Sequence, residues 1–522
     1  MSTAVYRVND ENIRDTTSWL TRLTFLYLGI PVFLFAAHWL NQGAAIFFSG
    51  ILLLGFWQAW SVHARPISMN FSRFISECAD KHAVVFTVFL VWMALSGVGG
   101  IGYQNTDYAA SNALLKDLIE NPWPLQLRDN VPLVYYVCYY LPAAIVGKLL
   151  GWTAAWIFIF IWTYIGLTIL WSVLSVALSL DNLTRKRQLL AALVFVFLGG
   201  WDALGALLTY PIDVLAPGTH IEWWASIGQF SSHTTLLFWV PQHVLAPWIA
   251  TAFLLLALKR SLGTESILLI AAFSFLWSPM ASLGLLPFLG LLLILNISIG
   301  RASSYLNSTN FFVAPALALL GMLYYASNAF RFPSGWQWSE PAFLRNYSLL
   351  IVLEAVPLSV PFLFQHMKQK IFLNEISLPP PVELGLPEKA FGWVAIGSLL
   401  LLPLYRVGIM NDLCMRASIP AILVLGSYFL RALRTEFTFQ TLQRSVVAVC
   451  VLLGAGSAVM EIQRSIMNHT IRIPAREAVS SLLNTTENSV VEQRAGDPEA
   501  FFWHWLGPIG NAESRSRRNK SN

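Results

Sequence analysis

One carboxylate, Asp107, follows an apolar run that begins near Ala83. The segment GIGYQNTDYAASNALLKDLIENPWP, residues 100–124, turns polar there, and apolar residues then recur at helical spacing. Asp107 therefore lies at the first turn of a short interfacial helix, which it can cap. A partly buried carboxylate at the mouth of a membrane cavity can also act as a general base, because burial raises its pKa. The two roles are compatible, and Asn105 and Asn112 are neighbours that can bind a substrate.

Two opposite charges, Asp412 and Arg416, occur together in the sequence MNDLCMR, next to another apolar run. They are four residues apart and share one face of a helix, where a simple ion pair is the ordinary explanation. A guanidinium at this place can also hold a phosphate through two parallel hydrogen bonds. Arg406 precedes the same loop and can do likewise. The sequence thus offers a base and a phosphate-binding cation in separate segments.

Two more ionisable residues lie inside apolar segments, where such residues are costly and often functional. Asp202 in GGWDALG follows two glycines that allow close contact between helices. It therefore either forms a structural hydrogen bond between helices or belongs to a functional site. His243 in WVPQHVLAPW lies between Pro241 and Pro247, which bend the helix. It either packs in the interior or lines a cavity.

Other polar loops contain residues whose role stays open. His220, Glu222 and His233 match no familiar metal-ligand spacing, so we predict no metal ligands and no cofactor, and the use of a divalent metal stays an open alternative. The Trp336 and Trp338 pair in SGWQWSEP suits either an aromatic belt at the membrane interface or a platform on which a sugar stacks.

These residues are part of a very apolar chain of 522 residues, 56% hydrophobic and 12% charged. Soluble domains have roughly a quarter of their residues charged. We predict an all-α, polytopic integral membrane protein with about thirteen transmembrane helices and interfacial helices in the first outer loop. The spans are expected near residues 19–38, 43–61, 83–102, 153–180, 188–208, 234–258, 265–280, 284–300, 309–327, 346–366, 389–405, 417–432 and 443–462.

Positive charge predicts the orientation of these spans. The run TRKR at 184–187 and the pair Arg431 and Arg434 should be cytoplasmic, and so should the N-terminus, because the first apolar stretch is long and lacks a cleavage site. This scheme requires that the tyrosine-rich segment 131–152 lies along the outer interface instead of spanning the membrane. The first outer loop then covers about residues 103–152.

The organisation predicted is one transmembrane domain over residues 1–462 and a polar C-terminal tail over residues 463–522, which we expect to be extracytoplasmic. The net charge of +5 is spread over the loops, so it bears on membrane orientation and not on nucleic-acid binding. The four cysteines share no short metal-type spacing and are expected to be free thiols.

An acid just after an early membrane helix, a large first outer loop with interfacial helices and an aromatic PLxYYxxxYLPxxxxGKLxG segment resemble the multispanning glycosyltransferases of the C superfamily. That superfamily includes protein O-mannosyltransferases, aminoarabinose transferases and many uncharacterised bacterial members. The counterpart segment there begins with a proline-leucine pair, follows the outer interface and ends at a glycine, like Pro132, Leu133 and Gly151 here. The resemblance covers the topology and roughly residues 83–260. Many relatives carry adjacent acids or an acid followed by histidine, whereas Thr106 precedes Asp107 in this chain.

The resemblance implies an inverting transfer of a sugar from a polyprenyl-phosphate-linked donor to an acceptor at the extracytoplasmic face of a bacterial inner membrane. Asp107 would be the general base. The expected partners are the lipid-linked donor, an acceptor that is a glycan, a lipid or a protein, and membrane lipids, with no nucleic acid. The alternatives are a transporter or flippase of a lipid-linked saccharide, which Asp202 and His243 would also suit, and a polymerase of surface polysaccharide.

Overall fold

The computed structural model describes residues 2–62, 69–210, 216, 218–258, 265–298, 309–371, 384–434, 441–483 and 491–508. These residues are mostly helical, with very little strand, so the all-α prediction is confirmed. The described part contains one small sheet, in which β1 (Ser334–Trp336) pairs antiparallel with β2 (Tyr405–Val407).

Seven helical stretches in the described chain are long and apolar enough to cross a membrane, and each overlaps a predicted span. They run over Arg14–Trp39, Trp152–Leu178, Pro279–Ser298, Thr309–Ala326, Phe343–Met367, Asp412–Arg431 and Leu442–Met467. The helices concerned are α1 (Ser2–Trp39), α6 (Trp152–Leu178), α12 (Pro279–Leu283), α13 (Leu286–Ser298), α14 (Ala314–Ala326), α15 (Phe343–Leu350), α16 (Val356–Ile371), α18 (Asp412–Ala417), α19 (Ile419–Arg431), α20 (Thr441–Gly454) and α21 (Gly456–Met467).

The other predicted spans contain further helices, several of them short. These are α2 (Gln42–Val62), α3 (Phe71–Ala94), α7 (Arg185–Val196), α8 (Asp202–Thr209), α9 (His233–Trp239), α10 (Pro241–Ala257), α11 (Glu265–Trp277) and α17 (Leu386–Leu401).

The predicted span 188–208 is not continuous, because α7 ends at Val196 and α8 begins at Asp202. The two glycines between them lie against other segments. A Cβ atom on Gly199 would be 2.9 Å from the carbonyl oxygen of Gly454, and one on Gly200 would be 2.6 Å from Cγ of Glu354. Only glycine permits these approaches, and they hold the chain between α7 and α8 close to the helices around it.

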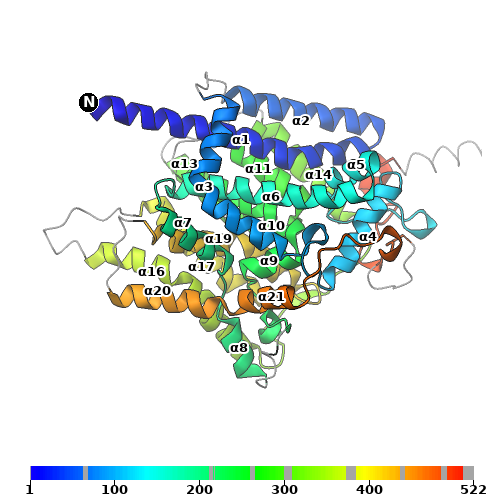
Figure 1. Cartoon of the computed structure of the whole chain (residues 1–522). Helices are drawn as coiled ribbons and strands as arrows, with labels where there is room; N and C mark the ends of the chain where they lie inside the picture. The colour runs from blue at the N-terminus through cyan, green and yellow to red at the C-terminus, as the bar shows by residue number, and fades with distance from the viewer. Residues whose placement is uncertain are drawn as a thin grey trace, which may run out of the picture.

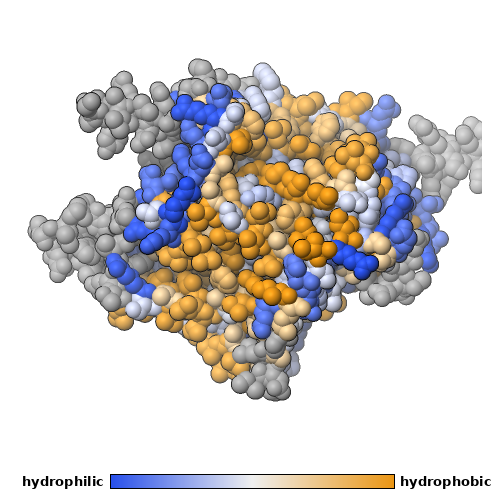
Figure 2. Space-filling model, viewed as in Figure 1, coloured by the Kyte–Doolittle hydropathy of each residue, from blue (hydrophilic) through white to orange (hydrophobic). Residues whose placement is uncertain are grey.

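The surface is compatible with an integral membrane protein. Figure 2 shows apolar surface across the middle of the molecule, with hydrophilic surface at its left and right ends. The helices α1, α6 and α20 cross Figure 1 from one of these ends towards the other. Large apolar side chains such as Trp57, Val91 and Ile157 are more than half exposed, which suits contact with lipid.

The predicted first outer loop contains two helices, α4 (Asp107–Glu120) and α5 (Leu141–Leu150). The apolar side of α4, with Leu114 and Leu118, is fully buried. Residues 131–140 form turns and extended chain instead of lengthening α5. The helix α5 ends at Gly151, whose φ of 92° is accessible to glycine at little cost.

The chain after α21 folds back onto this loop, and Figure 1 shows it reaching α4. Ile471 pairs with Ile101 in an antiparallel bridge, and the Gly102 N–H donates to the Thr470 carbonyl at 2.9 Å. Further on, Phe502 and Trp503 are completely buried. The described chain after α21, which ends at Met467, therefore contacts the first outer loop and buries part of its own length against the rest of the protein.

The contact between α12 and α18 gives a test of the fold. A Cβ atom on Gly284 would lie 2.1 Å from the backbone oxygen of Ala417, whereas one on Gly290 would meet nothing within 4 Å. We expect Gly284→Ala to destabilise the protein by about 1–3 kcal/mol, because overpacking shifts the backbone. Gly290→Ala should be neutral or slightly stabilising. Thermal unfolding of the purified variants in detergent measures this, and equal midpoints would contradict the described packing.

Candidate functional site

Loops that are far apart in the sequence meet at one end of the molecule. Asn105 Nδ2 donates to the Phe238 carbonyl at 2.8 Å, and the side-chain amides of Gln337 and Asn411 both donate to the Ile227 carbonyl at 2.8 Å. We call this end the loop face and define it by residues 96–107, 131–137, 218–232, 327–338, 405–416, 468–483 and 491–508.

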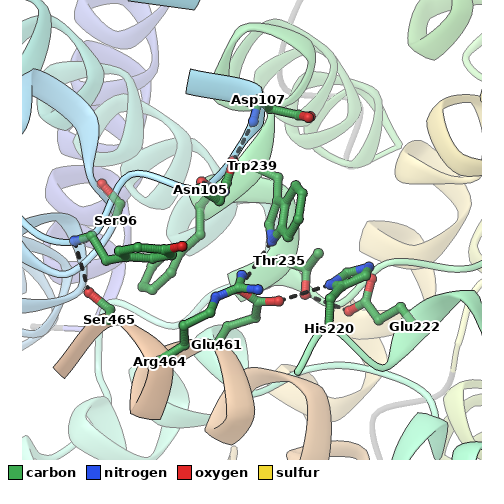
Figure 3. Close-up of polar contacts among 12 residues, drawn as sticks. Ser96, Asn105, Asp107, His220, Glu222, Thr235, Trp239, Glu461, Arg464 and Ser465 are labelled. Carbon is green, nitrogen blue, oxygen red and sulfur yellow. Dashed lines mark hydrogen bonds and ion pairs between the residues drawn. The ribbon is translucent and has the colours of Figure 1, made fainter. Parts of the chain in front are cut away.

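Asp107 is the first residue of α4, and Asn105 fixes its position. Asn105 Oδ1 accepts the Asp107 backbone N–H at 3.0 Å (Figure 3). Its amide nitrogen donates to the Phe238 carbonyl near the end of α9. Asn105 is buried and both of its polar groups are used within the protein, so the side-chain oxygen that accepts a backbone N–H at the start of α4 belongs to Asn105 and not to Asp107. The Asp107 carboxylate is exposed and makes no hydrogen bond with the described residues.

Although it is exposed, Asp107 is surrounded closely enough by protein for desolvation to raise the pKa of its carboxyl group. The charges of Arg416, His220 and Arg494 oppose this rise, and the charge of Asp412 adds to it. A carboxylate that water can reach but protein encloses has the properties of a general base. Asp107 and Arg416, predicted from separate segments, thus lie within electrostatic reach of each other.

The predicted ion pair between Asp412 and Arg416 is present. Asp412 Oδ1 accepts from Arg416 Nη2 at 3.1 Å and from Nε at 3.2 Å, and the arginine side chain is 17% exposed. A tight turn places Asp412, since Gly408 has a φ of +84° and a Cβ atom on it would be 2.3 Å from Asp412 Oδ2. Asn411 then caps α18 by accepting from the Cys414 N–H at 3.3 Å.

A row of rings leads from the C-terminal segment to α10. The guanidinium carbon of Arg494 is 4.4 Å from the ring centroid of Tyr135, which in turn is 4.7 Å from that of Tyr136. Tyr136 meets the ring of His243 edge-on at 4.4 Å, and His243 Nδ1 is 2.9 Å from Ser278 Oγ. Arg416 is within electrostatic reach of both Tyr136 and His243. His243, predicted as a cavity residue or a packing residue, is thus buried beside the arginine.

The structure does not bring every predicted residue to Asp107. Arg406 pairs with Glu340 at 3.6 Å on the small sheet, and Asn112 donates to Gln104 at 2.9 Å. Asp202 is completely buried and accepts from Ser457 at 2.9 Å and from Trp224 at 3.3 Å. In the part of the chain that is described, no hydrogen bond or ion pair joins these three to Asp107.

Sequence reasoning did not find Arg494. It lies in a polar segment with no pattern that links it to the rest of the chain, and only the fold places it on Tyr135. Its backbone oxygen accepts from the Val134 N–H at 2.9 Å, and the adjacent Ala495 forms a bridge with Leu133. The C-terminal segment therefore supplies a second cation to the surroundings of Asp107.

A buried network supports the loop face below Asp107 (Figure 3). Glu461 on α21 binds His220 Nδ1 at 2.9 Å, accepts from the Trp239 indole at 3.0 Å and pairs with Arg464. Glu222 accepts from the Thr235 hydroxyl at 2.6 Å. Because buried carboxylates are tolerated only when hydrogen-bonded, these contacts tie the 220–222 turn, α9 and α21 together.

The pKa values of Glu222 and His220 are shifted by burial and by neighbouring charges. Burial and the charge of Asp202 raise the pKa of Glu222 to about 7, against the opposing charge of His220. Burial alone would lower the pKa of His220, but its bond to Glu461 and the charges of Glu222 and Glu461 outweigh it, so the pKa is raised. Both groups therefore hold protons more firmly in the folded protein.

A polar hollow of about 490 Å³ opens where the first loop meets the C-terminal segment. It is lined by Gly100, Gly102, Tyr103, Gln104, Met467, Asn468, His469, Thr470 and Arg472. Among the described residues, no group of three or more histidine, cysteine or acidic side chains is placed to hold a metal ion.

No protein family model, no curated protein and no solved structure matches this chain. Its function is therefore inferred from the residues and their geometry.

The shifted groups of the network predict a pH dependence of stability. A raised folded-state pKa means that the folded state binds more protons, so stability should fall as pH rises from about 5 to 7. For Glu222 the difference between 4.5 and about 7 corresponds to about 3 kcal/mol at most. Glu222→Gln should flatten this dependence, measured by thermal unfolding across that range.

Glu492→Gln, which changes an exposed acid on the same face, is the matched control and should keep the wild-type slope. An unchanged slope in Glu222→Gln would show that Glu222 is ionised throughout.

Proposed function

We propose that this protein transfers a sugar from a polyprenyl-phosphate-linked donor to an acceptor at the extracytoplasmic membrane face, with inversion, as a glycosyltransferase similar to those of the C superfamily. The observation that carries the proposal is the position of Asp107. Its carboxylate is accessible, free of hydrogen bonds to the described residues and within electrostatic reach of Arg416.

The proposed reaction is a single displacement. Asp107 takes the proton of an acceptor hydroxyl as the hydroxyl oxygen bonds to the anomeric carbon of the donor sugar. The bond between that carbon and the phosphate oxygen breaks, and the electron pair leaves with the polyprenyl phosphate. Attack opposite the leaving group inverts the anomeric centre, and positioned proton transfer of this kind contributes about 10² to 10⁴ in rate.

Arg416 and Arg494 are suited to receive the leaving phosphate. Arg416 uses Nε and one terminal nitrogen for Asp412, and a guanidinium has five N–H donors, so donors are left for a phosphate. Protonation of Asp107 removes a negative charge from the site at the moment when the phosphate gains one. The positive charge of the two arginines is then offset by one negative charge fewer. It can therefore stabilise the negative charge that develops on the phosphate in the transition state.

We also propose the topology in full. The shorter apolar helices add crossings to the seven long ones, for a total of about thirteen, in a bacterial inner membrane. The loop face is extracytoplasmic and the N-terminus cytoplasmic. Supporting this, Lys81, His82 and Asp181 line one hollow near the basic start of α7, in chain regions where positive charge predicts the cytoplasm.

A transporter or flippase of a lipid-linked saccharide is the second candidate. The observation that favours it is the break between α7 and α8, where Asp202 and Glu354 are both completely buried. Purified protein in detergent, given labelled polyprenyl-phosphate sugars and candidate acceptors, distinguishes the two, because turnover without a second compartment excludes pure transport. A ladder of lengthening products would indicate the polymerase alternative.

Substitution of the base tests the proposed chemistry. Asp107→Asn and Asp107→Ala should each reduce sugar transfer by about 10² to 10⁴-fold with normal protein levels, since proton transfer to the carboxylate is lost. Asp129→Asn changes an exposed aspartate of the same loop and should keep full activity. Wild-type turnover by either Asp107 variant would remove the residue from its assigned role.

Substitution of an arginine near Asp107 is expected to change the pH profile of kcat/KM. The charge of Arg494 lowers the pKa of Asp107, so Arg494→Gln should raise that pKa and move the acid limb of kcat/KM to higher pH. Activity at high pH should fall much less than in Arg416→Gln, which also loses the partner of Asp412. Arg472→Gln, an exposed arginine of the C-terminal segment, is the control. An acid limb that Arg494→Gln leaves in place would contradict the assignment.

A further inference from the structure

A small apolar surface outside the seven long spans suggests a contact beyond the sugar-transfer site. We call it the hairpin patch, and it consists of Phe332, Trp336, Trp338, Ile409 and Met410. All five are exposed, Trp336 by 54%, Trp338 by 60% and Ile409 by 65%. Large apolar side chains gathered in this way on an exposed loop are unusual and mark an interaction surface.

The hairpin patch has a defined shape. Trp336 pairs with Tyr405 in the sheet, and the Gly408 N–H donates to the Pro333 carbonyl at 2.9 Å, so the two segments form one unit. The Trp336 and Trp338 rings are nearly parallel, with centroids 4.3 Å apart and planes at 13°. Their stacking gives the patch a broad indole surface, and indoles favour the boundary between water and lipid.

The position of the hairpin patch links it to lipid. Its first segment lies between α14, which ends at Ala326, and α15, which begins at Phe343, and its second segment leads into α18, which begins at Asp412. Exposed apolar side chains continue on the adjoining helices, with Met322 at 51% and Leu344 at 76%. The patch is therefore an extension of the surface that the spans present to the hydrocarbon.

The charges around the hairpin patch suit phospholipid headgroups. Arg331 and Arg406 lie in the two segments and Arg345 lies in the first turn of α15, and the acid that pairs with Arg406 is Glu340. The excess of positive charge beside an apolar surface complements phosphate groups that sit above acyl chains.

We propose that the hairpin patch inserts into the headgroup region of the phospholipid bilayer on the side of the loop face. Because Gly408 contacts the Asp412 carboxylate and only Asn411 separates Met410 from Asp412, this insertion holds the Asp412–Arg416 pair at the depth of the lipid phosphates. A lipid-linked phosphate then meets Arg416 without leaving the membrane. The insertion itself does not depend on the proposed sugar transfer.

A depth measurement tests the insertion without any turnover. Ile409→Cys carries a fluorophore in a Cys78→Ser background, because the other native cysteines are buried. The labelled protein is placed in phosphatidylethanolamine and phosphatidylglycerol vesicles with spin labels on the headgroup or along the acyl chain. The control label is at Glu499→Cys, an exposed position of the C-terminal segment.

We expect spin-labelled lipid to quench the fluorophore at residue 409 several-fold more than the one at residue 499, and aqueous iodide to quench it less. Equal iodide quenching at both positions, without quenching by lipid, would overturn the proposal. So would protection of the 409 label from iodide by soluble saccharides, which would identify a sugar platform. Met410→Cys reports on the same surface and replaces Ile409→Cys if that variant fails to fold.

Discussion

The burial of carboxylates inside an apolar protein is the constraint on which the loop face depends. Asp202, Glu222, Glu354 and Glu461 are all buried, and each must find hydrogen-bond donors that water cannot supply. They find them in loops and helices from distant parts of the chain, including the Phe230 N–H for Glu354 and the Trp239 indole for Glu461. The hydrogen bonds to these carboxylates fix how α8, α9 and α21 pack against one another. The loops that follow these helices are positioned by that packing.

Asp107 gains its properties from this packing. Asn105 holds the start of α4 against the end of α9, so the carboxylate stays in one place without using its own oxygens. The residue remains accessible, and neither of its carboxylate oxygens makes a hydrogen bond with the described residues. Asn105 therefore positions the start of α4, while the carboxylate of Asp107 stays exposed.

Much of the fold could be predicted from the sequence, because apolar runs and the pairing of Asp412 with Arg416 are local patterns. The break in the span 188–208 could not, since it depends on the approach of Gly199 to Gly454, which no local signal reveals. Asp107 and Arg416 were predicted to act together because of their chemical types. Their proximity in space, however, depends on tertiary contacts that the sequence does not reveal. Arg494 escaped prediction because a lone arginine in a polar segment carries no periodic pattern.

The docking of the C-terminal segment has a consequence for biogenesis. Val134 and Arg494 are joined by a backbone hydrogen bond although about two-thirds of the chain lies between them. During synthesis the first loop must wait, with Tyr135 uncovered, until the last helix has been inserted and the segment behind it released. The protein therefore completes its charged centre as one of the final events of assembly.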